Sequence, residues 1–125
     1  MKTVLIADDN LASRELLRDA LEAPEFRFVE ASNGQEALEK IQTESPDLVL
    51  LDIQMPSLDG FEVLRAAREL NPPSSAQFIA LTAFAMESDR QRIRKAGFDG
   101  YASKPISVSD LRMQVKRMLS EEDNG

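Results

Sequence analysis

The stretch VLIADD, residues 4–9, sets the pattern from which the fold is predicted, because four apolar residues run directly into two aspartates. Two further apolar runs have the same character, at residues 48–51 and 78–81. Each run is rich in Val, Ile or Leu and is bounded by polar residues, which is typical of a short strand buried on both faces. We therefore expect these three strands to lie in the middle of a sheet.

Longer segments with a helical period lie between the apolar runs. Their apolar residues recur every three or four positions, which predicts helices that bury one stripe of side chains. The predicted stripes are Leu16, Leu17, Ala20 and Leu21, then Ala37, Leu38 and Ile41, and then Leu64, Ala67 and Leu70. Residues 26–30 alternate more openly, as an edge strand does, and residues 100–102 predict a weak last strand.

Strand and helix thus alternate along the chain in five βα units. Parallel strands joined by right-handed helical crossovers form a sheet with helices on both faces. We predict an α/β protein with a three-layer flavodoxin-like (βα)5 fold and the parallel strand order 2-1-3-4-5. In this architecture reacting groups gather at the carboxyl ends of the strands, near the point between strands 1 and 3.

Polar residues and one glycine predict where helices begin and end. Ser32 stands three positions before Gln35, and Ser107 stands three positions before Asp110. Both spacings are typical of a capping box at the start of a helix. Gly97 fits the end of a helix, because glycine accepts the left-handed backbone conformation that closes many helices.

The length of 125 residues suits one domain. The last helical stripe finishes near Leu119, so we expect the domain over residues 1–119 and a solvated tail over residues 120–125. The start of the chain lacks the long apolar stretch of a secretory signal, and no apolar segment approaches the length of a membrane span. We expect a cytoplasmic protein that does not bind membranes.

Composition limits the chemistry of the chain. The 15 Lys and Arg are outnumbered by 22 Asp and Glu, for a net charge of -7, which argues against nucleic acid as a partner. The chain has no Cys and no His, so thiol catalysis, disulfides, imidazole bases and His-ligated metals are excluded. Any catalytic or binding chemistry must therefore use carboxylates, hydroxyls, Lys and Arg.

Polar residues of these types follow the predicted strands. Asp8 and Asp9 follow the first strand, Asp52 the third, Thr82 the fourth and Lys104 the last. Each one alone could cap a helix or begin a turn, but the fold brings all of them to one edge of the sheet. Three carboxylates repel one another unless a divalent cation neutralises them, and Mg²⁺ prefers oxygen ligands. The cluster therefore predicts a Mg²⁺ site.

With these residues the chain resembles the receiver domains of two-component response regulators, which are similar to chemotaxis regulators. The motifs are VLIADDN at residues 4–10, LLDIQMPSLDG at 50–60, ALTA at 80–83 and SKP at 103–105. They cover essentially the whole chain in the expected order and spacing. Residues 81–106 are similar to the receivers of single-domain cell-cycle regulators and of hybrid histidine kinases, and they do not decide between the two.

The resemblance implies a role for each acidic residue. Asp52 matches the phosphoacceptor, a carboxylate nucleophile that takes a phosphoryl group from a phosphohistidine on a sensor histidine kinase or a histidine phosphotransfer protein. Asp8 and Asp9 match the acidic pair that holds Mg²⁺ together with Asp52 and the backbone carbonyl of Gln54. The protein is then a phosphoacceptor switch that assists its own phosphorylation and dephosphorylation, and not an enzyme.

The same resemblance implies a switch. Lys104 matches the residue whose ammonium contacts a phosphoryl oxygen, and its bond to Pro105 is expected to be cis. Thr82 matches the hydroxyl that moves toward the phosphoryl group, and Tyr101 matches the aromatic residue that follows it inward. The phosphoryl group adds charge and three strong acceptors, so the conformation in which Thr82 and Lys104 reach it becomes favoured.

The predicted helix at residues 86–96 is highly charged, and Ile93 is almost its only large apolar residue. Such a helix buries little and is weakly anchored, although a charged run is as often a plain solvated face. The resemblance implies that helix 4, strand 5 and helix 5 form the face that meets a downstream protein partner. The basic residues Arg90, Arg92, Arg94 and Lys95 favour an acidic partner surface. The expected oligomeric state is a monomer or a weak dimer.

Three alternatives stay open from the sequence. The chain resembles a receiver module of a larger hybrid kinase as well as a separate regulator. An aspartate-nucleophile phosphohydrolase of the haloacid dehalogenase type would have Asp at the position of Gln54, and it would need more residues for a substrate cap. A flavodoxin would have a Ser, Thr and Gly-rich phosphate loop where this chain has Asp8, Asp9 and Asn10.

The resemblance implies that two positions influence the lifetime of the phosphoryl group, Gln54 and Phe84. We expect slow self-dephosphorylation, because Phe84 would obstruct the approach of water and Gln54 would activate that water poorly. The Phe84→Glu variant should therefore lose its phosphoryl group faster than the wild-type protein, as measured by the decay of the phosphorylated form. An equal or slower decay in the variant would contradict this expectation.

Overall fold

The computed structural model describes residues 1–83 and 86–124, and it describes side chains as far as Leu119. Strands and helices alternate through this part of the chain. The strands are β1 (Lys2–Ala7), β2 (Phe26–Ala31), β3 (Leu48–Asp52), β4 (Gln77–Thr82) and β5 (Gly100–Ser103). The helices are α1 (Leu11–Leu21), α2 (Gly34–Glu44), α3 (Gly60–Arg68), α4 (Glu87–Ala96) and α5 (Val108–Asn124). Within the described residues, no helix is long and apolar enough to cross a membrane.

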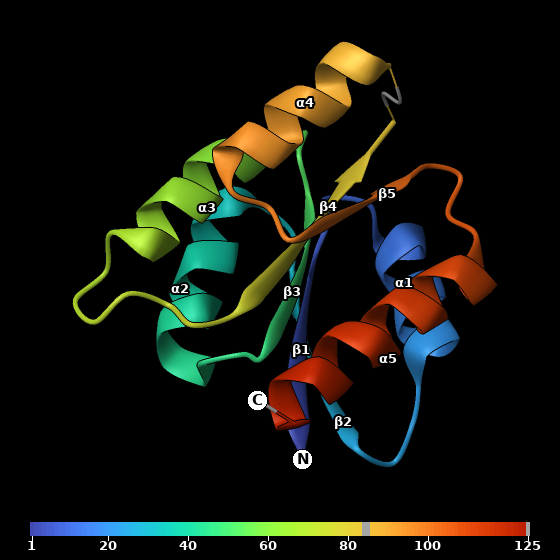
Figure 1. The fold of residues 1–125 in the computed structure, drawn as a ribbon. Coiled ribbons are helices and arrows are strands. Elements are labelled where there is room, and N and C mark those ends of the chain that lie inside the picture. Colours follow the sequence, from blue (N-terminus) through green and yellow to red (C-terminus); the bar gives the residue numbers. More distant parts are fainter. Residues whose placement is uncertain (84–85, 125) are drawn as a thin grey trace.

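The strands form one parallel sheet in the order β2-β1-β3-β4-β5, which confirms the predicted flavodoxin-like topology. The helices cover both faces, with α1 and α5 on one side and α2, α3 and α4 on the other (Figure 1). The N-terminus and the last turn of α5 lie at the lower edge of the sheet in this view. The carboxyl ends of β1, β3 and β4 therefore meet at the opposite, upper edge.

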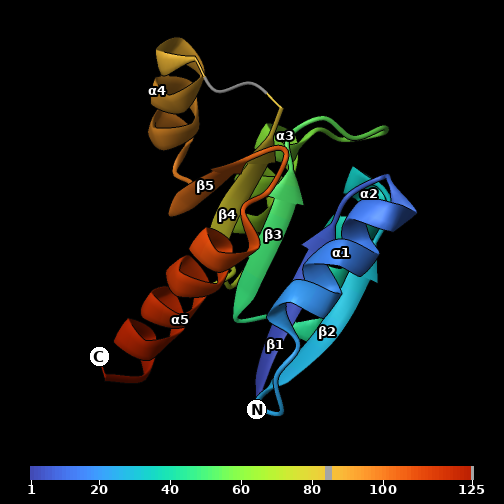
Figure 2. The same ribbon diagram turned by 90° about the vertical axis from the view of Figure 1, so that its right-hand side faces the viewer.

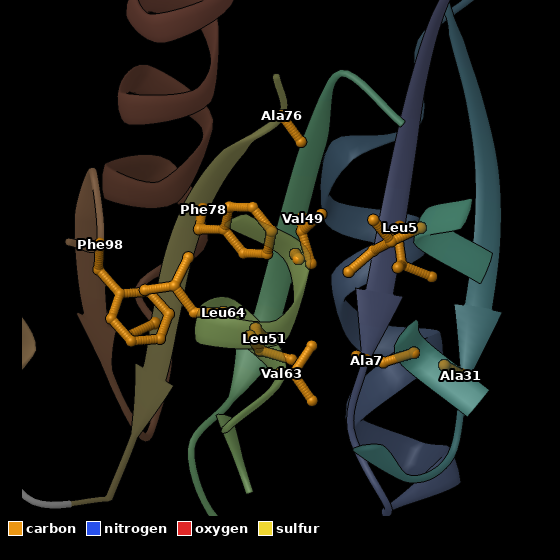
Figure 3. Close-up of a cluster of buried hydrophobic side chains, with 14 of the residues drawn as sticks. Leu5, Ala7, Ala31, Val49, Leu51, Val63, Leu64, Ala76, Phe78 and Phe98 are labelled. Carbon is orange, nitrogen blue, oxygen red and sulfur yellow. The ribbon is translucent and has the colours of Figure 1, made fainter. Parts of the chain in front are cut away.

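The three central strands are buried on both faces, as predicted from their unbroken apolar runs. Alternate residues of each strand enter two separate clusters. Val4, Leu50 and Ile79 pack with α1 and α5, the two helices that lie in front of the sheet in Figure 2. Leu5 and Phe78 belong to the other cluster, which packs under α2 and α3 (Figure 3). Burial of each large apolar side chain contributes about 1.5–3 kcal/mol, so these strands form the rigid centre of the molecule.

Two helix boundaries confirm the predictions and one corrects them. Gly97 closes α4 with a left-handed φ of 103°, and the Ser107 hydroxyl accepts a hydrogen bond from the Asp110 amide, at 3.4 Å, where α5 begins. The prediction that Ser32 caps α2 with Gln35 is wrong by one position. Asn33 is the cap, and its side chain accepts from the Glu36 amide at 2.8 Å.

The one-residue shift also involves the side chain of Glu36, which completes the hydrogen bonds at the start of α2. The Glu36 carboxylate accepts from the Ser32 amide at 3.1 Å, so it holds the residue before the cap as well. Asn and Ser are similarly good caps, and the spacing alone favours neither. The local sequence therefore predicts that a helix begins near Ser32 and Asn33. The packing of Gly34, the residue after Asn33, decides which of the two is the cap.

Three further details differ from the sequence-based expectations. Leu16 is 52% exposed, whereas its neighbours Leu17 and Leu21 are buried, so the buried stripe of α1 is narrower than predicted. Helix α3 ends at Arg68, so Leu70 lies beyond it. Helix α5 runs to Asn124 and does not finish near Leu119. The division of the chain into a domain and a solvated tail stays a prediction.

The loop between β3 and α3, residues 53–59, is seated on the first turn of α2. The Gly34 amide donates to the Pro56 carbonyl at 3.2 Å, and the Gln35 amide donates to the Ser57 hydroxyl at 3.1 Å. A Cβ atom added to Gly34 would lie 1.9 Å from the Leu58 carbonyl oxygen. Only glycine lets the loop approach this closely, and the loop begins directly after Asp52.

Replacing Gly34 by Ala should lower the free energy of unfolding by about 1–3 kcal/mol, the usual cost of forcing an extra carbon into a packed site. Urea unfolding of the purified variant measures this loss. Gln35→Ala is the matched control, because this neighbouring side chain is exposed and the bond to Ser57 comes from its backbone. Equal stability of the Gly34→Ala and Gln35→Ala variants would contradict the proposed contact.

Candidate functional site

The polar residues predicted to gather at the carboxyl edge of the sheet do lie there. Asp52 and Thr82 end β3 and β4, and Asp8 and Lys104 directly follow β1 and β5. Asp8 is fully buried and Asp52 and Thr82 are nearly so, with 0%, 6% and 4% exposure. Asp9 is exposed. The edge therefore combines buried carboxylates with one that faces the solvent.

Three carboxylates at this edge converge. One oxygen from each of Asp8, Asp9 and Asp52 lies within 4.8 Å of the others. Mg²⁺ binds through oxygen ligands and keeps several of its waters. The set of carboxylate oxygens suits that ion, and the exposed Asp9 leaves a path to solvent for the remaining waters. The residues present therefore fit a Mg²⁺ site.

The two buried carboxylates are held in the same way. The Asn10 amide donates to Asp8 Oδ1 at 2.9 Å, and the Gln54 amide donates to Asp52 Oδ1 at 2.9 Å. In each case the donor is the amide two residues further along, so the turn that follows the strand binds the carboxylate at the strand's carboxyl end. Both side chains are thereby oriented before any ligand arrives.

The other oxygen of each buried carboxylate contacts Lys104. The Nζ atom of Lys104 lies 2.9 Å from Asp8 Oδ2 and 2.9 Å from Asp52 Oδ2. Its backbone amide donates to the Thr82 carbonyl at 2.7 Å, and the Lys104–Pro105 bond is cis, as the resemblance implied. One ammonium therefore bridges two carboxylates that would otherwise repel each other.

Burial and charge act in opposite directions on these groups. Burial raises the pKa of the Asp52 carboxyl; the hydrogen bonds from Lys104 and from the Gln54 amide oppose this rise, and the nearby charge of Asp8 adds to it. Burial alone would lower the pKa of Lys104, but its hydrogen bonds to Asp8 and Asp52 outweigh burial and raise it. Lys104 is therefore a firmly charged ammonium beside a carboxylate whose ionisation is costly.

The residues expected to form the switch lie on β4 and β5. Thr82 is buried at the end of β4, next to Ser103 in the register of β5. Tyr101 is half-buried on β5, and the guanidinium carbon of Arg90 lies 5.4 Å from the centre of its ring. Phe84, expected to affect the phosphoryl lifetime, lies outside the described residues.

A cavity of about 230 Å³ opens beside the site, between α3 and α4. It is lined by Ile53, Gln54, Asp59, Phe61, Thr82, Asp89, Arg92 and Ile93. The guanidinium carbon of Arg92 lies 4.2 Å from the centre of the Phe61 ring. The side of α4 that faces α3 is therefore held by a stacked arginine as well as by the buried Ile93, a contact that the sequence analysis did not anticipate.

Arg14 is a second residue that sequence analysis missed. It lies on α1, and its Nη1 atom donates to the Asp8 carbonyl at 2.7 Å. The sequence gives only a weak signal for this contact, because an arginine in the middle of an amphipathic helix is normally predicted to face the solvent.

The comparisons with known proteins agree with one another. The model of the response regulator receiver domain matches residues 4–116. Over 120 residues, 96% of this chain and 98% of the relative, the chain is 39% identical to the polar-differentiation response regulator DivK of Brucella anthropi. The fold is similar to the receiver domain of the Francisella response regulator 1452, with a TM-score of 0.89 and 29% identity over 98% of this chain and 99% of that one. A CheY-like receiver domain protein of Methanospirillum hungatei JF-1 gives a TM-score of 0.87 and 32% identity over 100% and 99%.

The raised pKa of Asp52 predicts how stability depends on pH. The folded state binds the Asp52 proton more tightly than the unfolded chain does, so the folded state loses stability as the pH rises from the ordinary value of 3.8 through the raised value. Asp52→Asn does not carry this cost. Without divalent cations, the variant should be more stable than wild type at neutral pH, and its advantage should shrink as the pH falls.

Urea unfolding at a series of pH values, with a chelator present, measures this advantage. Asp19→Asn removes an exposed carboxylate from α1 and serves as the control, for which we expect little change at any pH. An advantage of Asp52→Asn that stays constant across the acidic range would contradict the prediction.

Proposed function

The chain belongs to the family of receiver domains of two-component response regulators, and on that premise we propose that Asp52 is its phosphoacceptor. The observation that carries this proposal is the arrangement around Asp52. Its carboxylate is nearly buried at the end of β3, and it shares the Lys104 ammonium with Asp8. Asp9 completes the acidic cluster on the exposed side.

The proposed reaction is a transfer between two proteins. An oxygen of Asp52 attacks the phosphorus of a phosphohistidine on the partner, the new O–P bond forms, and the N–P bond breaks with its electron pair returning to the imidazole. The chain has no histidine, so the donor imidazole lies outside it. Receiver domains act with histidine kinases or phosphotransfer proteins upstream.

The proposed metal ligands are Asp8, Asp9, Asp52 and the backbone carbonyl of Gln54. A bound Mg²⁺ would neutralise the charge that accumulates on the phosphoryl oxygens during the transfer. Before transfer, the Lys104 ammonium contacts both buried carboxylates and offsets part of their charge. After transfer, its ammonium can exchange a carboxylate for a phosphoryl oxygen without leaving the site, because a lysine offers three donors on a flexible stem.

We place the switch in Thr82, Tyr101 and the surface formed by α4, β5 and α5. A phosphoryl group on Asp52 offers new acceptors to Thr82 and Lys104, and this shifts the population toward the conformation in which both reach it. Helix α4 buries only Ile93 among its own residues, so it can move at a small cost in buried surface. Its Arg90, Arg92, Arg94 and Lys95 favour an acidic surface on the downstream partner.

The role we propose is that of a signalling switch that assists its own phosphorylation and dephosphorylation, in the cytoplasm, as a monomer or weak dimer. The same site would serve a receiver module within a hybrid kinase. Membership of the receiver family leaves the phosphohydrolase and flavodoxin alternatives without support. Gln54 stands where the phosphohydrolase would need an aspartate, and Asp8 and Asp9 stand where a flavin phosphate would bind.

Incubation with acetyl phosphate and Mg²⁺ tests the assignment without a partner protein. The wild-type chain should gain the mass of one phosphoryl group, and a chelator should prevent the gain. Asp52→Asn should abolish labelling, because an amide is not a nucleophile toward phosphorus. Intact-mass measurement reads both results.

Asp89→Asn is the matched control for this experiment. Asp89 lies on α4 and lines the cavity beside Thr82, so its removal changes the charge near the site without touching the proposed acceptor. It should be labelled like the wild-type protein. Stable labelling of Asp52→Asn at the wild-type level would refute the assignment of the phosphoacceptor.

A further inference from the structure

Arg14 connects the acidic cluster to a second layer of charges behind it. Its Nη1 atom donates to the Asp8 carbonyl oxygen at 2.7 Å, and its Nε atom donates to Glu30 Oε1 at 3.0 Å. The Arg14 side chain is only 14% exposed. A guanidinium that is this well covered and bound at two of its nitrogens has little freedom to move.

The carbonyl that Arg14 binds belongs to the peptide that joins Asp8 to Asp9, which are two of the three residues that converge in the cluster. The Asp8 amide donates to the Ala31 carbonyl at 3.1 Å, at the end of β2, and the Asn10 amide binds the Asp8 side chain. Arg14 adds a restraint on the carbonyl of this peptide. It acts on the peptide plane that sets the direction in which the exposed Asp9 leaves the backbone.

Glu30 makes this restraint compatible with a cation nearby. Its carboxylate accepts from Arg14 on one oxygen and from Arg18 Nη1, at 3.0 Å, on the other. The charge of Arg14 is thereby partly offset on the side away from the cluster. A guanidinium without this partner would repel a divalent ion, whereas a paired one can orient the turn at a small electrostatic cost.

We propose that Arg14 is a positioning residue for divalent-cation binding, which it promotes by orienting the Asp8–Asp9 peptide so that both carboxylates converge with Asp52. This inference rests on the proposed function, in which the cluster binds Mg²⁺. Arg14 does not touch the ion or the phosphoryl group. Residues that orient metal ligands in this indirect way typically change metal affinity by about 10–100-fold when they are removed.

The test compares two arginines that bind the same carboxylate. Arg14→Gln removes the contact with the Asp8 carbonyl. Arg18→Gln removes the other partner of Glu30, and Arg18 is 55% exposed and contributes a surface ion pair. The dissociation constant for Mg²⁺ is measured by isothermal titration calorimetry on the folded proteins, and urea unfolding without metal gives their stabilities.

Arg14→Gln should weaken Mg²⁺ binding by about 10-fold or more, and Arg18→Gln by less than about two-fold. A purely structural role would lower the stability of Arg14→Gln without changing its affinity for Mg²⁺, so affinity is the decisive measurement. If Arg14→Gln does not fold, the lysine variants answer the same question. Arg14→Lys keeps the charge but loses the planar fork, and it should bind Mg²⁺ more weakly than Arg18→Lys does.

Two kinds of result would overturn the inference, and only the second would also overturn the proposed metal site. Wild-type affinity for Mg²⁺ in the folded Arg14 variant, or an equal loss in the Arg18 variant, would refute the role of Arg14 alone. Failure of the wild-type protein to bind Mg²⁺ would refute the proposed metal site and the role of Arg14 together.

Discussion

Two buried carboxylates that share one ammonium are the interaction on which the site depends. Asp8 and Asp52 lie at the carboxyl ends of neighbouring strands with almost no access to water, and like charges at this depth are costly. Lys104 offsets that cost with two short contacts. This lysine comes from the loop that follows the edge strand β5. The carboxyl ends of β1, β3 and β5 are thereby tied together by charge. In the sheet itself β1 pairs directly with β3, and β4 lies between β3 and β5.

The rigid centre of the sheet makes this arrangement possible. Three strands buried on both faces hold their carboxyl ends at a constant spacing. The turns after β1 and β3 then orient the carboxylates of Asp8 and Asp52. The second restraint comes from outside the sheet. Gly34 seats the loop that follows Asp52, and Arg14 binds the turn that follows β1. The site residues thus lie at the ends of strands, and contacts from the surrounding helices orient the loops between them.

Much of this could be predicted from the sequence, and the exceptions have physical reasons. Unbroken apolar runs identify buried parallel strands, and the strand order brings Asp8, Asp52 and Lys104 together. The cap of α2 was misplaced by one residue because Ser32 and Asn33 are equally suitable, and the choice depends on how Gly34 packs against a loop distant in sequence. Arg14 was missed for a similar reason, since the contact that links it to the site is with a backbone carbonyl, and a backbone carbonyl leaves no signature in the sequence.

The position of Tyr101 gives the protein a built-in optical reporter. The chain has a single tyrosine and no tryptophan, so its ultraviolet emission comes almost entirely from one ring. That ring is half-buried on β5, next to the guanidinium of Arg90 on α4. A change in the distance between α4 and β5 alters the surroundings of Tyr101, the only strong chromophore. The fluorescence of the unlabelled, unmodified chain therefore reports on the surface that we propose to meet a partner.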